Sequence, residues 1–405
     1  MDAAQESINF VREQQGPLFH VVETYRLSPH SKGEDTRDER EMDEAWRQDP
    51  VTIFSQEFPE EYEKILSEVN AELNSAVETI ESSFQPLSEE EYRHLDRPLN
   101  NRQSETKWYP LVLSDAKMVH RINGFFKEAL QDDFTVFFGE DVQSPYGGPF
   151  KVANDLSDLF PEKVWSTPIS EAAIAGIANG LALNGIKPYA EIMFGDFTTL
   201  AFDQIVNHAS KFYHMYGGKI NCPVVFRTPM GGGRGYGPTH SQTLDKFLLG
   251  IDNINVVALN KLVDPLQIYR AVHAERHPVV VIENKMDYGR AIHENPVRGY
   301  MYEISNEPYP TVSISPSNHS PSITIACYGG TVAMVEESLN EIFVEVEAFA
   351  EVIVLSLISP LDVSHIVESV ERTGNLLIVE EGTFEGGFGD TVLASVFEKS
   401  QSRFE

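Results

Sequence analysis

The sequence predicts an α/β protein in which a parallel-sheet domain and a smaller α/β domain follow a mainly helical N-terminal segment. Beyond the first polar break, short apolar runs alternate with helix-like stretches, as strands and covering helices do in a mostly parallel sheet. These runs are almost continuously apolar, which is typical of strands covered on both faces. Two polar breaks, at 86–114 and 296–320, are expected linkers. They leave an N-terminal segment over 1–85, a central domain over 115–295 and a C-terminal domain over 321–405.

The N-terminal segment is acidic, and its pattern is mostly helical. A short apolar run at 17–25, PLFHVVETY, is a strand candidate. A helix is expected over 60–84, because apolar residues recur there at helical spacing. They are Ile65, Val69, Leu73, Val77 and Ile80. Such an amphipathic helix should lie on a neighbour.

The central domain alternates between the two kinds of element. Helices are expected at 118–130, 170–184, 200–215 and 264–275, and strands at 134–141, 187–194, 222–228, 253–258 and 278–283. The same alternation predicts the smaller domain. Its strands are expected at 322–330, 351–357 and 375–382, and its helices at 331–345, at 362–373 and from 389.

Composition excludes several classes of function. The 405 residues carry a formal net charge of −31, which argues against a nucleic-acid partner because such binding needs Lys and Arg on phosphates. Cys222 and Cys327 lie in apolar segments and are expected to be buried residues. The N-terminus lacks the features of a secretory signal, and no apolar run approaches the length of a membrane span. We therefore expect a soluble cytoplasmic protein.

The segment TPISEAAIAGIANG (167–180) places one carboxylate, Glu171, at the start of a helix of small apolar residues. A carboxylate in a first helical turn is favoured by the helix dipole, and this is the simpler interpretation. Close packing around the small residues would also desolvate the carboxylate. That would raise its pKa and suit proton exchange with a ligand nitrogen.

Two further segments carry candidate site residues. The glycine-rich segment PMGGGRGYGPTHSQ (229–242) ends near His240, which is a candidate acid, base or ligand contact, although a plain surface loop is the alternative. Met193 and Phe197 flank a strand-to-helix turn, where α/β sheets bind ligands. Core packing is the alternative for each of them. An aromatic ring at that turn could stack on a planar ligand.

Other signals are weak or absent. His30 and Ser31 lie in a polar segment after the N-terminal strand candidate, and a solvated loop is the default interpretation. No cluster of residues has the spacing of metal ligands. The chain also lacks a GDG followed by Asn, which would indicate binding of a magnesium diphosphate.

Taken together, the motifs resemble a known family. They are GEDV (139–142), YGGPFKV (146–152), TPISEAAIAG (167–176), EIMFGDF (191–197), FDQIVNHASK (202–211), PVVFRTPMGGG (223–233), THSQ (239–242), PVVVIENKMDYG (278–289), ISPLD (358–362) and VESVERTGNLLIVEEG (367–382). In this order they resemble the β subunit of the thiamine-diphosphate-dependent decarboxylating component of 2-oxo acid dehydrogenase complexes, of the pyruvate, branched-chain 2-oxo acid or acetoin type. Residues 1–85 resemble the last part of the α subunit, through GPLFHVVETYRLSPHSKGED (16–35) and EAWRQDPV (44–51).

The resemblance implies a transketolase-like pyrimidine-binding domain, a transketolase-like C-terminal domain that ends early, and roles for single residues. Glu171 matches the glutamate that hydrogen-bonds the aminopyrimidine of thiamine diphosphate. Phe197 matches the ring stacked on that pyrimidine, and Ile169 and Met193 match its apolar neighbours. His240 matches a histidine that assists acyl transfer to a lipoyl group. His30 and Ser31 match α-subunit residues near the cofactor diphosphate, although Pro29 and Glu39 depart from the family pattern there.

The resemblance also implies partners. An α-subunit-like chain would supply the diphosphate-binding domain and the ligands of Mg²⁺, and a lipoyl acyltransferase would accept the acyl group. The assembly would be homodimeric or heterotetrameric. Two alternatives stay open at this point. One is thiamine-dependent ketol transfer or carbon–carbon bond formation without a lipoyl partner, and the other is a non-catalytic assembly subunit.

Overall fold

The computed structural model describes residues 2–14, 16, 18–28, 37–83 and 106–400 of the chain. They belong to two compact units, Met1–Ser88 and Glu89–Glu405, which we describe separately. None of the helices in these ranges is long and apolar enough to cross a membrane.

The N-terminal unit consists of helices. Their bounds are α1 (Asp2–Gln14), α2 (Glu39–Arg47), α3 (Pro50–Glu57) and α4 (Pro59–Ser83). Asp38 and Asp49 cap α2 and α3, because each carboxylate accepts a hydrogen bond from a first-turn backbone N–H, at 2.8 Å in both cases. The four helices contain no buried residue. The strand candidate at 17–25 is wrong, since residues 18–25 form no strand and have no neighbouring strand to pair with among the described residues.

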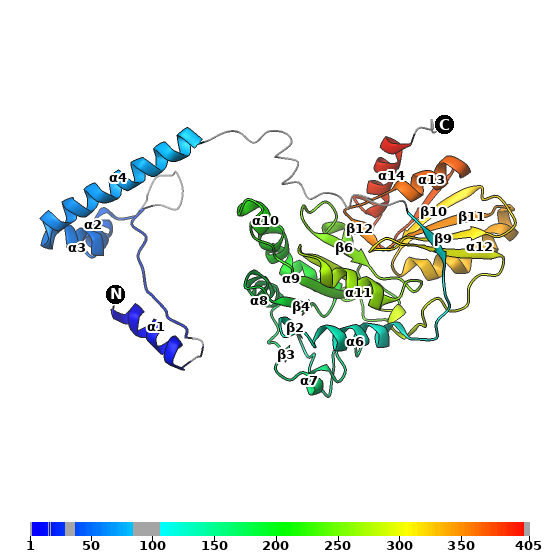
Figure 1. Cartoon of the computed structure of the whole chain (residues 1–405), viewed down its shortest axis with the longest axis horizontal. Coiled ribbons are helices and arrows are strands. Elements are labelled where there is room, and N and C mark those ends of the chain that lie inside the picture. Colours follow the sequence, from blue (N-terminus) through cyan, green and yellow to red (C-terminus); the bar gives the residue numbers. More distant parts are fainter. Residues whose placement is uncertain (1, 15, 17, 29–36, 84–105, 401–405) are drawn as a thin grey trace. The chain divides into compact units, whose positions relative to one another are not determined.

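The second unit contains two sheets with helices packed around them (Figure 1). The first sheet has the order β12-β6-β7-β5-β4-β2-β3. Its strands are β2 (Thr135–Gly139), β3 (Val164–Ser166), β4 (Lys187–Glu191), β5 (Val225–Met230), β6 (Asn255–Ala258), β7 (Val279–Asn284) and β12 (Leu357–Ser359). All neighbouring pairs are parallel except β12 with β6. This confirms the predicted parallel sheet.

Helices cover both faces of the first sheet. They are α6 (Met118–Ala129), α7 (Leu156–Leu159), α8 (Glu171–Leu183), α9 (Thr198–Asp203), α10 (Phe212–Met215) and α11 (Pro265–Ala274). Alternate residues of one strand enter different cores: Phe137 of β2 packs with α6 and α11, whereas Val136 and Phe138 pack with α8 and α9. This two-sided burial explains why the strands are apolar throughout.

The helix expected at 200–215 is interrupted. Between α9 and α10 the chain forms a π-helical segment, Gln204–Ala209. Asn179 of α8 donates a hydrogen bond to the carbonyl of Gln204 at 2.8 Å, at the first residue of this segment. Inserted π turns of this kind break the simple helical period, so apolar spacing did not reveal it.

The second sheet has the order β1-β8-β9-β11-β10-β13. Its strands are β1 (Trp108–Pro110), β8 (Tyr300–Ser305), β9 (Val312–Pro316), β10 (Ile323–Tyr328), β11 (Ala350–Leu355) and β13 (Leu376–Val379), and its helices are α12 (Thr331–Val346), α13 (Ser364–Thr373) and α14 (Phe388–Lys399). The ranges 86–114 and 296–320 were expected to be linkers, and this needs correction: β1, β8 and β9 lie within them. These antiparallel strands are short or have one partly exposed face, so they lack a continuous apolar run.

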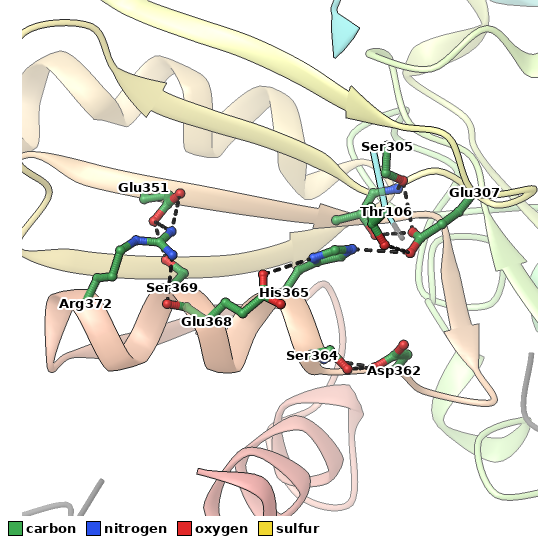
Figure 2. A network of polar contacts seen from close by, with 11 residues as sticks. Thr106, Ser305, Glu307, Glu351, Asp362, Ser364, His365, Glu368, Ser369 and Arg372 are labelled. Carbon is green, nitrogen blue, oxygen red and sulfur yellow. Dashed lines mark hydrogen bonds and ion pairs between the residues drawn. The ribbon is translucent and has the colours of Figure 1, made fainter. Parts of the chain in front are cut away.

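A polar network connects Thr106, just before β1, and the end of β8 with α13 through Glu307 (Figure 2). Ser305, at the end of β8, donates to Glu307 at 2.9 Å, and the Nε2 of His365 lies 3.3 Å from the other Glu307 oxygen. The His365 ring meets Trp108 of β1 edge to face at 4.9 Å. Within the range expected as a linker, β1 is therefore part of the second sheet.

The run EVIVLSL (351–357) was expected to be one strand, but it enters both sheets. β11 belongs to the second sheet and β12 to the first. Between them, the carbonyl of Ser356 accepts a hydrogen bond from Ala258 of β6 at 2.8 Å. The two sheets of this unit are therefore connected by backbone hydrogen bonds.

Candidate active site

The candidate residues follow three parallel strands of the first sheet, at the edge where these strands end. Glu171 comes after β3, Met193 and Phe197 after β4, and His240 after β5. Carboxyl ends of parallel strands meet at one edge of a sheet, and loops there build ligand sites in α/β folds. The strand order explains how residues distant in sequence share one region.

Glu171 is the first residue of α8, directly after Ser170. Its side chain is only 6% exposed. Within the part of the chain that the structure describes, the carboxylate has no hydrogen-bond partner. The helix dipole favours a negative charge at this end, but it does not replace a partner for a buried carboxylate. The carboxylate is thus available to a ligand donor.

A second buried carboxylate, Glu140, interacts with Glu171. It follows β2 directly, and its Oε1 has no hydrogen-bond partner among the described residues. Burial raises the pKa of Glu140, and the negative charge of Glu171 raises it further. Burial and the neighbouring carboxylate thus both disfavour the charged form of Glu140.

Met193 and Phe197 lie on the turn between β4 and α9. This turn contains a short 3₁₀ segment, Gly195–Phe197, that passes so close to β5 that a Cβ on Gly195 would overlap the Met230 side chain. Both Met193 and Phe197 are partly buried against the core. Phe197 leads directly into α9, which packs against α8, the helix that begins with Glu171. The turn gives the site an apolar, aromatic wall.

His240 joins this wall from the glycine-rich segment after β5. Its imidazole lies 4.8 Å from the Phe194 ring and 5.1 Å from the Phe197 ring, edge to face in both cases. Its Nδ1 is 3.0 Å from the Thr239 hydroxyl. At the start of the segment, Gly231 has a φ of +95°, and a Cβ there would lie 2.6 Å from the Asn284 amide nitrogen. Close backbone packing therefore requires glycine at this position.

A buried ionic network lies inside the sheet beside these residues. Arg227 of β5 pairs with Glu191 of β4 and with Glu283 of β7, where its Nε is 3.0 Å from Glu283 Oε1. The hydroxyl of Tyr288 donates to Glu283 at 2.6 Å. Burial raises the pKa of Glu191, and the Arg227 charge acts against this rise.

This network connects to the aromatic wall through Phe150. The Phe150 ring stacks on Tyr288 at 5.0 Å and meets Phe194 edge to face at 5.9 Å. The network was not predicted. A possible signal was present, because Arg227 and Glu283 are single charges within otherwise apolar strands. Glu191 ends a strand whose only other charge is Lys187, and Glu140 follows the apolar run FTVFFG.

The structure brings together part of the set predicted from the sequence. Phe197 and His240 are in contact, Met193 shares the Phe197 turn, and Glu171 interacts with the unpredicted Glu140. Ile169, in contrast, is 84% exposed, so within this chain its side chain is open to solvent. His30 and Ser31 lie outside the described residues.

The residues present fit the pyrimidine of thiamine diphosphate. Glu171 offers a buried carboxylate without a partner, and Met193 and Phe197 offer an apolar wall for a planar ring. Across the described ranges, no group of three or more His, Cys, Asp or Glu side chains is placed to hold a metal ion.

Comparisons with known proteins match two domain models within the second unit. Residues 122–290 match the family model described as transketolase, pyrimidine binding domain, and residues 315–404 match transketolase, C-terminal domain. One solved structure, titled split gene transketolase, inactive beta4 tetramer, has a TM-score of 0.53 and 20% identity over 71% of this chain and 86% of its own. This last likeness concerns the fold alone.

Curated relatives are more similar in sequence. The pyruvate dehydrogenase E1 component subunit beta of Rickettsia bellii (strain RML369-C) is 34% identical over 277 residues, which are 68% of this chain and 82% of the relative. The 2-oxoisovalerate dehydrogenase subunit beta, mitochondrial, of Dictyostelium discoideum is 33% identical over 279 residues, 68% of this chain and 73% of the relative. The chain therefore belongs to the family of β subunits of the pyruvate and 2-oxoisovalerate dehydrogenases.

Proposed function

We propose that this chain is the β-type subunit of a thiamine-diphosphate-dependent component that decarboxylates a 2-oxo acid and transfers the acyl group to a lipoyl carrier. The observation that carries the proposal is the buried Glu171 carboxylate, which has no partner within the described residues and starts the helix packed beside the Phe197 turn. Family membership supports the reaction class.

Each site residue has a distinct role in this proposal. When bound, thiamine diphosphate supplies the carbon that adds to the keto group and takes up the electrons released with CO₂. Glu171 holds a proton at a ring nitrogen of the pyrimidine, and its burial strengthens that hydrogen bond. Met193 and Phe197 orient the ring and exclude water from one side. His240 is half-buried against Phe197 and acts as the acid or base during acyl transfer.

A partner chain completes the site. We infer that an α-type chain supplies the diphosphate-binding domain and the Mg²⁺ ligands, in a homodimeric or heterotetrameric assembly. The outer face of α8 supports this, because Ala172, Ala173, Ile177 and Gly180 are all exposed on the helix that begins with Glu171. Ile169 is exposed just before the same helix. A subunit that covers this apolar face would make Ile169 a neighbour of the cofactor.

The N-terminal unit is proposed to be an α-subunit-like tail that binds the same α-type chain. Its long helix α4 carries an exposed apolar row, here called the α4 stripe. The stripe consists of Ile65, Val69, Leu73, Val77 and Ile80, each between 46% and 62% exposed. Helical geometry places Glu72 along one side of the stripe and Glu81 along the other. A groove with an apolar floor and basic borders would fit it.

Two further parts of the proposal concern the partner that accepts the acyl group and the location of the protein. The acceptor is a lipoyl acyltransferase, which is consistent with the word component in the name of the Rickettsia bellii relative. The proposed location is the cytoplasm, although several relatives carry the word mitochondrial in their names.

The test combines the full chain with an α-type subunit and measures decarboxylation of pyruvate and of branched 2-oxo acids with an artificial electron acceptor. Glu171→Gln should remove nearly all activity, because the amide cannot hold the ring proton in the same way. Titration calorimetry with thiamine diphosphate, with and without the α-type subunit, checks that the site needs both chains.

Glu162→Gln provides the matched control, since Glu162 is an exposed glutamate that precedes β3. This variant should keep full activity. If Glu171→Gln folds, assembles with the partner and still decarboxylates at the wild-type rate, the proposed role of the carboxylate is wrong.

A further inference from the structure

Lys285 is a buried lysine directly after β7, beside the glycine-rich segment of residues 231–242, here called the 231–242 loop. It is 1% exposed, which is unusual for a lysine. The loop follows β5, and β5 is the neighbour of β7 in the sheet. Lys285 and the 231–242 loop therefore follow two neighbouring strands at the same edge of the sheet.

Three hydrogen bonds connect Lys285 to β5 and the loop. Its backbone N–H donates to the carbonyl of Met230, the last residue of β5, at 3.0 Å. Its carbonyl accepts a hydrogen bond from the guanidinium of Arg234 at 2.9 Å. Its ammonium Nζ donates to the carbonyl of His240 at 2.7 Å. One residue thus fixes the beginning, the middle and the end of a loop rich in glycine.

The surroundings of the ammonium explain how a cation remains there. Burial lowers the pKa of Lys285, whereas the carboxylates of Asp196 and Glu381 favour its charged form. Its Nζ lies 5.1 Å from the centre of the Phe194 ring. Phe194 in turn contacts the His240 imidazole. Lys285 therefore influences the position of His240 in two ways. It binds the His240 carbonyl oxygen, and it contacts the Phe194 ring that packs against the His240 imidazole.

The same two carboxylates hold the loop themselves. Glu381 accepts the backbone N–H of Gly232 at 2.7 Å, and Asp196 accepts the side-chain amide of Gln242 at 2.7 Å. The positive charge of Lys285 therefore interacts with both carboxylates that hold the ends of the loop.

We propose that Lys285 is the positioning residue of the 231–242 loop and determines where the His240 imidazole stands against Phe197. The inference rests on the proposed function for the role of His240, but the geometry of the loop can be tested without cofactor. Lys285 touches no reacting atom in this proposal. Its loss should disturb acyl transfer more than decarboxylation.

The first test is hydrogen–deuterium exchange of the 231–242 loop in the full chain. Lys285→Met keeps the length of the side chain and removes its charge and its donor. A lost hydrogen bond from a charged group should speed exchange of loop amides by about tenfold or more. Lys285→Arg, which keeps a cationic donor, should restore protection at least in part.

Lys246→Met is the matched control. Lys246 also donates to a backbone carbonyl, that of Glu385 at 2.8 Å, but this carbonyl lies in a different loop. Exchange of the 231–242 loop should be unchanged in this variant. Unchanged exchange in folded Lys285→Met would overturn the proposal.

A spectroscopic measurement locates His240 itself. The ring currents of Phe194 and Phe197 should shift the imidazole signals of His240 in labelled protein, with His240→Gln providing the assignment. In Lys285→Met these signals should move toward those of free histidine. If Lys285→Met fails to fold, Arg234→Met removes the hydrogen bond to the Lys285 carbonyl, together with the contact of Arg234 with the Phe150 ring. Unchanged exchange at residues 233–237 in this variant would then overturn the proposal.

Activity separates this inference from the function on which it rests. With the α-type subunit, Lys285→Met should lower the rate of lipoyl acylation about tenfold, while decarboxylation with an artificial acceptor changes less than about twofold. An inactive wild-type assembly would contradict the proposed function, but exchange and the His240 signals would still decide the role of Lys285. Equal losses in both rates would contradict a positioning role specific to His240.

Discussion

The ring of Phe197 meets the imidazole of His240 edge to face at 5.1 Å, although β5 separates the two residues in the chain. The proposed ring-stacking residue and the proposed acyl-transfer residue therefore share one contact. Replacement of either side chain should change the position of the other, so each can be tested by a variant of its neighbour.

Replacement of Phe197 tests the aromatic wall. Phe197→Ala should weaken binding of thiamine diphosphate to the assembled protein by about tenfold, because a stacked ring contributes roughly 1 kcal/mol beyond its buried area. Calorimetry measures this loss. Phe134→Ala removes a ring that is 62% exposed at the start of β2 and should leave affinity unchanged. Equal affinities of the two variants would exclude stacking on Phe197.

Removal of Arg227 tests the buried ionic network. Arg227→Met leaves Glu191 and Glu283 buried without their cation, so the free energy of unfolding should fall by about 3–5 kcal/mol. Urea unfolding provides the measurement. Arg270→Met breaks an exposed pair with Glu128, in which the side chains are 58% and 51% exposed, and should leave the free energy of unfolding nearly unchanged. Similar losses in both variants would argue against a structural role of the network.

The pH dependence of stability tests Asp287, which is 3% exposed. Burial raises its pKa to about 7, against the charges of Arg290 and Lys261. The folded state thus favours the protonated form of Asp287. The contribution of this protonated form to the free energy of unfolding is fully present below about pH 4 and is lost as the pH rises to about 7. Asp287→Asn stays neutral, so the variant should gain stability relative to wild type across this range. Chemical unfolding at several pH values measures the difference.

The stability of Asp287→Asn must be compared with that of wild type at each pH, because His293 changes stability with pH in the opposite direction. Burial lowers its pKa to about 4, so its contribution is lost as the pH falls from about 6.5 toward 4. This slope is present in both proteins and cancels in their difference. Asp252→Asn, at an exposed position, should give a curve parallel to wild type. A constant difference between Asp287→Asn and wild type would mean that Asp287 has an ordinary pKa.

A charge in the α4 stripe tests the proposed partner surface. Leu73→Glu should weaken association with the α-type subunit by at least about tenfold, since a charge would be buried in an apolar contact. Asn74→Glu adds the same charge to the neighbouring residue, off the stripe, and should have little effect. Analytical ultracentrifugation of each mixture gives the affinities. Equal affinities would exclude the stripe as the contact.

The sequence was informative where burial is two-sided. The continuous apolar runs of β2, β5 and β7 predicted the parallel sheet, because both faces of these strands are covered. The antiparallel strands β8 and β9 were missed, since β8 mixes exposed and buried residues without a clean period. The division of residues 350–359 between two sheets was also missed, because a continuous apolar run does not show that the strand partner changes from one sheet to the other.

The candidate site was predictable in part. The sequence pattern indicates Glu171, Phe197 and His240, and the family resemblance adds their roles. The contact of Phe197 with His240 follows from adjacent strands. Glu140 and Lys285 were not selected. Their importance arises from burial and from partners far away in the chain, and neither appears in a local pattern.

The exposed face of α8 has a consequence for how the protein responds to concentration. Ala173, Ile177 and Gly180 lie on the helix that begins with Glu171, so a subunit that covers them also changes the solvation of the carboxylate. Subunit association and cofactor binding then become one linked equilibrium, in which each strengthens the other by the same factor. Dilution should release the cofactor, and addition of cofactor should hold dilute subunits together.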